Sequence, residues 1–233
     1  MDVFLYSGQR ALVLAPHADD ETLGCAGVIQ KYISHGSSVR IVIASLTLKD
    51  SKRYRKEESS YGTYSGMKRI SELKEAMQLL GVSDFHILYK DRTGKQLYDS
   101  QLDRIPRAEL VANLERHIED FRPTVLYIPS ITKHQDHEAL HQAAIASTRP
   151  YFWNGTILVY ETDGELSFQP NLYVSLSEEE MNRKMKVLEA YQTQIGSIRH
   201  PVHPESLLHK AKFRGNQIFK EFAEAFQIIR MYG

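Results

Sequence analysis

An apolar run at residues 11–15 ends abruptly in a polar segment, Pro16 followed by His-Ala-Asp-Asp-Glu at residues 17–21. A run of this length, bounded by turn residues, is typical of a strand buried in a parallel sheet. One imidazole and three carboxylates cannot follow it into the core, because burying unpaired charge is costly. We therefore expect these side chains on the loop that leaves the carboxyl end of the strand, where open α/β sheets carry their chemistry.

Short apolar runs alternate with amphipathic stretches along most of the chain, as strands and helices do in α/β proteins. Strand–helix–strand units of this kind are almost always right-handed and build a parallel sheet. The predicted strands span residues 11–16, 39–46, 85–89, 124–129, 156–162 and 171–176. The predicted helices span residues 22–35, 68–80, 110–121, the stretch after 134–137 up to about 148, 177–194 and most of 205–228.

These elements predict an α/β fold, a Rossmann-like three-layer sandwich with a mostly parallel sheet. At 233 residues we expect a single domain, in which residues 1–150 form the Rossmann-like core and residues 151–233 add strands and helices that complete the pocket. The first strand is followed by carboxylates and not by the Gly-x-Gly-x-x-Gly loop that cradles a dinucleotide. A nicotinamide-type cofactor is therefore disfavoured.

The composition excludes several kinds of partner. Lys and Arg total 29, as do Asp and Glu, so no net field directs the chain toward nucleic acid or an anionic membrane. No stretch has the roughly 18 apolar residues that a membrane span needs, and no secretory signal is seen. The lone Cys25 excludes an internal disulfide and a Cys-rich metal site. We expect a cytoplasmic protein; its oligomeric state is open, a homo-oligomer included.

A second group of metal-type ligands follows the predicted strand 124–129, where residues 134–137 read His-Gln-Asp-His. The carboxyl ends of parallel strands meet at one edge of a sheet, so we expect this loop beside residues 17–21. His17 and Asp20 offer a nitrogen and an oxygen suited to a zinc-like cation, and His137 is the best candidate for a third ligand. Asp19 is left over as a carboxylate that can activate water.

The other residues of the second loop have several interpretations. His134 can stay off the metal and hydrogen-bond a substrate carbonyl oxygen, with Asp136 orienting or charging its ring. His141, one helical turn after His137, competes as a ligand, although packing or solvation accounts for it more simply. Either loop taken alone also fits a plain helix-capping segment. Their coincidence at one sheet edge favours a metal site.

The two loops together resemble those of the LmbE/PIG-L zinc-dependent de-N-acetylases, which act on N-acetylglucosamine-type groups. The chain departs from that family at Ala18 and Gln135, where proline is frequent, and at Thr132, where some members have a tyrosine that helps polarise the carbonyl. The resemblance covers nearly the whole chain, including residues 69–72, 80–82, 91–92, 188–191 with Gln194, and 223–226.

The resemblance implies a role for each site residue. The ligands of one zinc ion, or of another divalent metal, would be His17, Asp20 and His137. Asp19 would be the general base. His134 would stabilise the oxyanion or protonate the leaving amine, with Asp136 tuning it. Arg69 and Asp91 would hold sugar hydroxyls.

The expected reaction is zinc-dependent hydrolysis of the N-acetyl group of an N-acetylglucosamine-containing or related amino sugar, releasing acetate and a free amine. One alternative is a zinc amidase acting on a thiol-sugar conjugate or an antibiotic intermediate. Another is a metal-dependent sugar-binding protein without turnover, against which the spare carboxylate of Asp19 argues. The polar stretch 49–67 carries three residues suited to stacking on a sugar face, Tyr54, Tyr61 and Tyr64.

Overall fold

The computed structural model describes residues 6–46, 66–89, 101–162 and 168–231. They form one seven-stranded sheet in the order β3-β2-β1-β4-β5-β7-β6. Its first five strands along the chain are parallel: β1 (Arg10–Ala15), β2 (Ser38–Ser45), β3 (Asp84–Tyr89), β4 (Val125–Pro129) and β5 (Thr156–Tyr160). β7 (Phe222–Arg230) runs antiparallel to β5 and to β6 (Leu172–Leu176). The prediction of an α/β fold with a mostly parallel sheet is confirmed.

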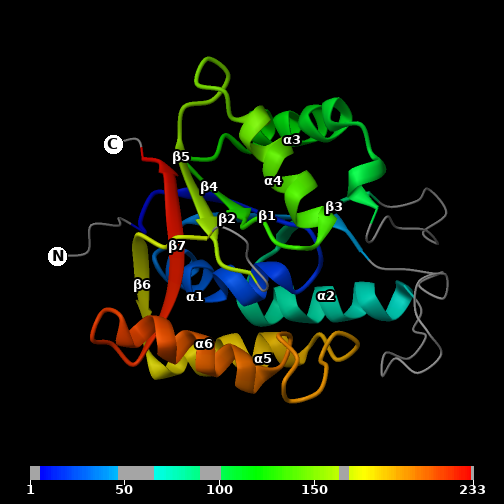
Figure 1. The fold of residues 1–233 in the computed structure, drawn as a ribbon. Helices are drawn as coiled ribbons and strands as arrows, with labels where there is room; N and C mark the ends of the chain where they lie inside the picture. Colours follow the sequence, from blue (N-terminus) through cyan, green and yellow to red (C-terminus); the bar gives the residue numbers. More distant parts are fainter. Residues whose placement is uncertain (1–5, 47–65, 90–100, 163–167, 232–233) are drawn as a thin grey trace.

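Helices cover both faces of the sheet (Figure 1). One layer holds α1 (Asp20–Ser34), α2 (Gly66–Leu80), α5 (Glu178–Glu189) and α6 (Pro204–Asn216). The other holds α3 (Arg107–Phe121), α4 (Gln135–Ser147) and the short 3-10 helix η2 (Leu102–Arg104). Burial on both faces is why the central strands read as continuous apolar runs. In the described ranges, no helix is both long and apolar enough to cross a membrane.

Side chains of β1 alternate between the two layers, as the pleat of a strand requires. Ala11, Val13 and Ala15 pack among the residues of α1, α2 and α5. Leu12 and Leu14 pack among those of α3 and α4. β1 therefore sits between two apolar cores, and its carboxyl end is held firmly where the first polar loop begins.

The C-terminal part of the chain differs from the prediction. Residues 205–228 are not mostly helical, because α6 ends at Asn216 and β7 begins at Phe222. A Cβ atom on Gly215 would lie 2.6 Å from two backbone carbonyl oxygens of the following turn, so only glycine fits at this reversal. Pairing with strands on both sides overrides the helical spacing of the apolar residues in 222–226. Phe219, expected in the packing stripe, is 99% exposed.

Helix α5 is also shorter than predicted. It begins after Ser177, whose hydroxyl caps Glu180 in a reciprocal capping box, as its sequence indicates. It ends at Glu189, so residues 190–194 lie outside the helix. This early end places Tyr191 and Thr193 behind the polar loop that follows β1, where both make buried or half-buried contacts.

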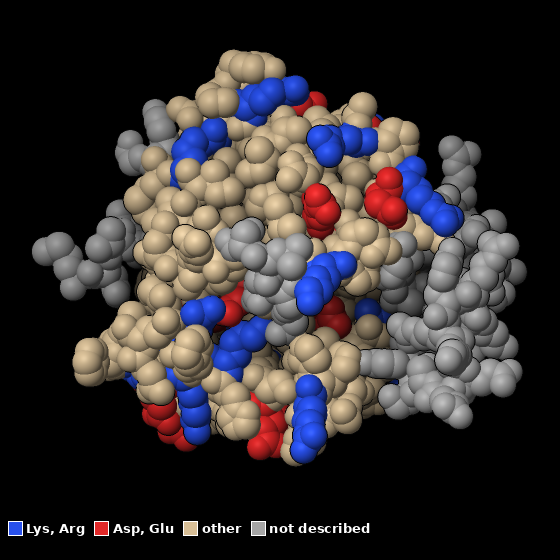
Figure 2. Space-filling model, in the orientation of Figure 1, with Lys and Arg blue, Asp and Glu red and all other residues tan. Residues whose placement is uncertain are grey.

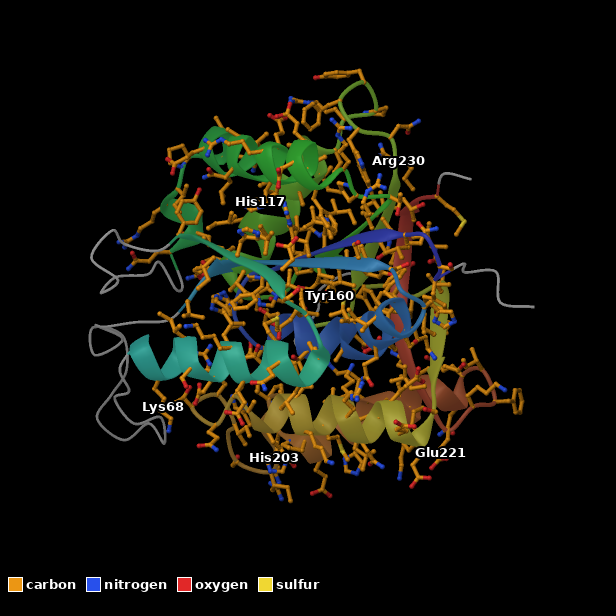
Figure 3. The ribbon with its side chains drawn as sticks, turned by 180° about the vertical axis from the view of Figure 1, so that it is seen from behind. Lys68, His117, Tyr160, His203, Glu221 and Arg230 are labelled. Atoms are coloured by element: carbon orange, nitrogen blue, oxygen red, sulfur yellow. The ribbon has the colours of Figure 1, made fainter. Side chains whose placement is uncertain are left out.

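Helix α1 packs against the sheet at two glycines. A Cβ atom on Gly24 would lie 2.1 Å from the ring of Tyr160, and one on Gly27 would lie 2.4 Å from the side chain of Leu176. Tyr160 lies at the centre of the molecule (Figure 3), and its hydroxyl donates to the carbonyl of Leu14. The two glycines therefore allow a close approach of this helix to the sheet, which sets the position of the first turn of α1.

A buried ion pair joins α1 to α5 and β7. The carboxylate of Glu224 accepts the backbone N–H groups of Gly27 (2.7 Å) and Val28 (2.8 Å), and lies 2.6 Å from the ammonium of Lys184. The same ammonium donates to the carbonyl of Leu23 at 2.8 Å. The pair thus binds the carbonyl of residue 23 and the amide of residue 27, which are partners in a regular helix. Glu224 and Lys184 are 4% and 2% exposed, so both charges depend on these bonds.

Replacing Lys184 with methionine tests this ion pair. Lys184→Met is expected to lower the free energy of unfolding by about 3–5 kcal/mol, because Glu224 keeps a buried charge without its partner. The double variant Lys184→Met/Glu224→Leu should cost less than the sum of the two single changes, since no charge is left buried. Urea unfolding measures all three.

Lys31→Met is the matched control, because Lys31 of α1 pairs with Glu180 of α5 at 2.8 Å near the surface and so joins the same two helices. It should cost less than about 1 kcal/mol, as solvated ion pairs do. Equal losses for Lys184→Met and Lys31→Met would contradict the assignment of the buried pair as the anchor of α1.

Candidate metal centre

Two loops at the carboxyl edge of the sheet, with the helix starts that follow them, bring five ionisable residues together: His17, Asp20, His134, Asp136 and His137. β1 and β4 are hydrogen-bonded neighbours, so residues 16–19 after β1 and residues 130–134 after β4 lie side by side. The ring centroid of His17 lies 4.8 Å from that of His134 and 5.6 Å from that of His137. The face of the molecule in Figure 2 is hollowed at its centre, above α5 and α6, and acidic and basic side chains gather there.

One carboxylate oxygen lies between two imidazoles. Oδ2 of Asp20 is 3.3 Å from Nδ1 of His17 and 3.5 Å from Nε2 of His137, and it accepts the backbone N–H of His17 at 3.1 Å. Ligand atoms of these three side chains all lie within 4.8 Å of one another. Asp20 and His137 are buried and His17 is half-buried, so water cannot surround the group fully.

The charge states suit a cation. Burial works to raise the pKa of Asp20, but the charge of His137 and the hydrogen bonds from His17 outweigh it, and that pKa lies below its ordinary value. Burial lowers the pKa of His137, which favours the neutral ring that binds metals. Its Nδ1 atom is buried without a hydrogen-bond partner among the described residues. Two imidazoles and one carboxylate fit the three-ligand set of a catalytic divalent metal site.

Asp136 contacts His17, which the sequence did not predict, and it also lies in one group with His134. Its Oδ2 lies 3.0 Å from Nε2 of His17, and its Oδ1 accepts the backbone N–H of Leu102 at 3.0 Å. Its own backbone N–H donates to Nδ1 of His134 at 3.2 Å, which makes His134 the N-cap of α4. With a cation bound in place of the Nδ1 proton, a carboxylate that accepts from Nε2 would keep the lone pair of His17 on Nδ1, the nitrogen that faces Asp20. Sequence reasoning missed this contact, because nothing in the spacing links residue 136 to residue 17.

Asp19 lies beside this group in an unusual conformation. Its backbone φ is +141°, and its N–H donates to Oε2 of Glu21 at 3.0 Å. Burial, followed by the charge of Asp20, raises the pKa of Asp19 well above its ordinary value, while Arg69 and His17 oppose the rise. A carboxyl group with a raised pKa is a stronger base once it has lost its proton.

Arg69 lies behind the first loop and has no exposed surface. Its Nη2 donates to the carbonyl of Ala18 at 2.9 Å, and its Nη1 approaches Glu72 (3.5 Å) and Thr193 (3.4 Å). Its expected contact with sugar hydroxyls stays a prediction. Asp91 and the tyrosines of 49–67 lie outside the described residues.

Two further expectations concern the loop before α4. The hydroxyl of Thr132 accepts the backbone N–H of His134 at 3.0 Å, so it shapes the turn that presents that ring. Ligand atoms of the described residues also converge in a second group, His17, His134 and Asp136. His141 belongs to neither group, and its Nδ1 lies 2.8 Å from the carbonyl of Pro129. Burial lowers the pKa of His141. It is therefore a packing residue at the end of β4, as the simpler interpretation proposed.

Residues 12–148, more than half of the chain, match the family model described as PIG-L: GlcNAc-PI de-N-acetylase. The chain belongs to the PIG-L family. Members of this family are metal-dependent deacetylases, so the predictions of the family and of the enzyme class are confirmed. The matched stretch runs from β1 through α4 and so contains both loops of the candidate centre.

Relatives and solved structures extend the comparison. A probable N-acetyl-α-D-glucosaminyl L-malate deacetylase 2 of Bacillus anthracis is 25% identical over 81% of this chain and 83% of its own. The N,N'-diacetylchitobiose deacetylase of Pyrococcus horikoshii superposes with a TM-score of 0.71 at 24% identity, over 95% of this chain and 84% of its own. The 4-carboxy-2-hydroxymuconate hydratase of Pseudomonas putida shares the fold at a TM-score of 0.69 and 15% identity, over 97% and 98%.

Removal of one ligand tests the candidate centre of this PIG-L protein. His137→Ala is expected to abolish stoichiometric zinc binding, because it removes one of three converging donors. His141→Ala, in the same helix one turn later, is the control and should bind zinc like the wild type. Competition against a chromogenic chelator measures both affinities. Undiminished zinc binding by His137→Ala would show that the three residues do not form the site.

The contact between Asp136 and His17 makes a separate prediction. Asp136→Ala removes the acceptor that orients the His17 ring, and zinc affinity should fall about 10- to 100-fold, as for other supporting carboxylates. Asp136→Asn keeps an oxygen that can accept from Nε2 and should lose less. The same chelator competition decides it, and an Asp136→Ala variant with wild-type affinity would rule out the orienting role.

Proposed function

We propose that this PIG-L protein hydrolyses the N-acetyl group of an N-acetylglucosamine-type amino sugar with the help of one zinc ion, releasing acetate and a free amine. The observation that carries the proposal is the convergence of His17, Asp20 and His137, with the separate, buried carboxylate of Asp19 on the same loop. The names of the relatives support the substrate class, because they act on acetylated amino sugars.

The proposed zinc ligands are His17, Asp20 and His137. When bound, the cation would supply Lewis acidity that polarises the amide carbonyl and makes water a better nucleophile. Asp136 would keep the His17 ring in the tautomer that offers Nδ1, through its 3.0 Å contact with Nε2. The neutral state favoured for His137 serves the same end, because only an unprotonated nitrogen can bind a metal.

Asp19 is the proposed general base. Its carboxylate takes the proton of the water that attacks the acetyl carbonyl. Burial raises its pKa, which increases its proton affinity, and the nearby cationic Arg69 limits that rise. A protein that only bound the sugar would have no use for a buried carboxylate in this position. This is why we favour turnover over a non-catalytic sugar-binding role.

His134 is the proposed stabiliser of the oxyanion and a proton donor to the leaving amine. Its Nδ1 accepts the backbone N–H of Asp136, so the neutral ring carries its proton on Nε2. From Nε2 it can donate to an oxygen or nitrogen of the reacting amide, a contribution that is worth about 3–4 kcal/mol in comparable sites. The 4.8 Å between the ring centroids of His134 and His17 supports a role for both rings at one reacting group.

The proposed contacts to the sugar itself come from the sequence alone. Asp91 stays the proposed ligand of sugar hydroxyls, and Arg69 is the second, although its burial points to a different use developed below. The cytoplasm stays the proposed compartment, supported by Cys25, which is free and buried and suits a reducing environment.

Acetate release from a panel of acetylated sugars tests the function. The zinc-loaded wild type should release acetate from one or more of N-acetylglucosamine, N,N'-diacetylchitobiose and N-acetylglucosaminyl conjugates of inositol and malate. Asp19→Asn, which keeps the shape of the side chain, should lower kcat by about 10²- to 10⁴-fold, the contribution usual for a general base. Its zinc affinity should equal that of the wild type.

The outcomes separate the two parts of the proposal. If Asp19→Asn retains near-normal turnover, another group is the base. If the wild type binds zinc tightly and releases no acetate from any member of the panel, deacetylation of these sugars is wrong. In that case product analysis with larger N-acyl conjugates distinguishes the amidase alternative from a receptor without turnover.

A further inference from the structure

Asp19 occupies a backbone conformation that side chains other than glycine rarely adopt. Its φ of +141° and ψ of −29° lie outside the regions that L-residues populate. Such a conformation persists only where the surrounding structure holds it, and it is concentrated at functional sites.

In this backbone conformation the Asp19 side chain does not cap helix α1. Asp19 is the N-cap of α1, and an aspartate at this position usually turns its carboxylate back to accept an N–H of the first turn. Here no side-chain capping bond is made. The backbone carbonyl of Asp19 accepts the N–H groups of Thr22 (2.9 Å) and Leu23 (2.8 Å). The helix therefore starts normally although the Asp19 carboxylate takes no part in the cap.

The peptide unit between Ala18 and Asp19 is bound at both of its polar ends. Its carbonyl, on Ala18, accepts from Nη2 of Arg69 at 2.9 Å. Its N–H, on Asp19, donates to Oε2 of Glu21 at 3.0 Å. The orientation of this peptide plane determines φ of Asp19, so these two bonds hold the strained angle. A rotation of the plane toward an ordinary φ would break both.

Glu21 is itself held by a second layer. Its side chain is fully buried, and its Oε1 accepts from the hydroxyls of Thr22 (2.6 Å) and Tyr191 (2.7 Å). Tyr191 is fully buried, and the guanidinium carbon of Arg69 lies 5.9 Å from its ring centroid. Both sides of the clamp thus meet behind the loop. The early end of α5 at Glu189 is what allows Tyr191 to reach it.

We propose that Glu21 and Arg69 are positioning residues that clamp the Ala18–Asp19 peptide, with Tyr191 bracing Glu21, so that the Asp19 carboxylate stays free of the helix cap and available to the reacting water. The inference rests on the proposed function for the role of Asp19. It also gives Arg69 a use that its full burial allows, in place of a contact with sugar.

Three changes at the clamp distinguish hydrogen bonding from charge and from simple stability. Glu21→Ala removes the acceptor, and kcat should fall about 10²-fold, the loss expected for a displacement of about 1 Å at the reacting group, with KM unchanged. Glu21→Gln keeps an oxygen for the Asp19 N–H and can donate to the Tyr191 and Thr22 hydroxyls, so it should retain most activity. Tyr191→Phe removes one brace and should give a smaller loss of kcat.

Tyr32→Phe is the matched control. It removes a buried hydroxyl from another ring packed in the same layer, which is hydrogen-bonded to Tyr127 at 2.9 Å and lies far along α1 from the loop. It should lower the melting temperature as Tyr191→Phe does and leave kcat unchanged. Zinc affinity should be unchanged in all four variants, since none removes a proposed ligand. A loss of kcat in Tyr32→Phe equal to that in Tyr191→Phe would overturn the proposal.

A structural readout keeps the clamp testable if no acetylated sugar is a substrate. Crystal structures of Glu21→Ala and Glu21→Gln should show φ of Asp19 returned to negative values in the first and kept positive in the second. A positive φ in Glu21→Ala would overturn the clamp. Loss of kcat in Glu21→Gln equal to that in Glu21→Ala would overturn the hydrogen-bonding role and favour a role of the charge. A rise of KM without a fall of kcat in Arg69→Met would show instead that Arg69 binds the sugar.

Discussion

The parallel pairing of β1 with β4 is the constraint on which the rest of the site depends. Ala11, Leu12 and Val13 pair with Val125, Leu126 and Tyr127, so both strands point the same way and end at the same edge. Because each strand is buried on both faces, neither can slip in register without exposing apolar side chains. The loops that follow, more than a hundred residues apart in the chain, are therefore brought together by packing alone.

Concentrating this much charge in a buried place has a cost, and the structure offsets it group by group. Asp19, Asp20, Glu21, Arg69 and Asp136 are all less than 9% exposed. An unpaired charge there would be strongly destabilising. The side chains of Asp20, Glu21, Arg69 and Asp136 each make hydrogen bonds, whereas burial raises the pKa of Asp19. The backbone takes part as much as the side chains do, through the amides of His17, Asp19 and Leu102 and the carbonyl of Ala18. These hydrogen bonds fix the loop at residues 16–19 from its buried side.

Much of this was predictable because the determining information is local. Apolar runs, helical spacing and capping residues placed the strands and helices up to β6, and the position of the two polar loops followed from the strand ends. β7 was not predictable in the same way, because its apolar spacing also fits a helix and only pairing with β5 and β6 decides between them. The contact of Asp136 with His17 and the position of Tyr191 against Glu21 likewise depend on three-dimensional packing. No spacing in the chain encodes them, although residues 188–191 belong to the stretches that resemble the family.

The fold does not choose the reaction. A deacetylase and a hydratase both superpose on nearly the whole of this chain, so the fold is compatible with more than one chemistry. What narrows the choice lies in the first loop. A cation site needs only His17, Asp20 and His137, and a stable helix start would be served better by an ordinary N-cap at Asp19. The chain instead keeps a strained backbone there and uses Glu21, Arg69 and Tyr191 to hold it. Stability alone does not account for that arrangement, whereas the role that we propose for Asp19, a general base kept clear of its own helix, does.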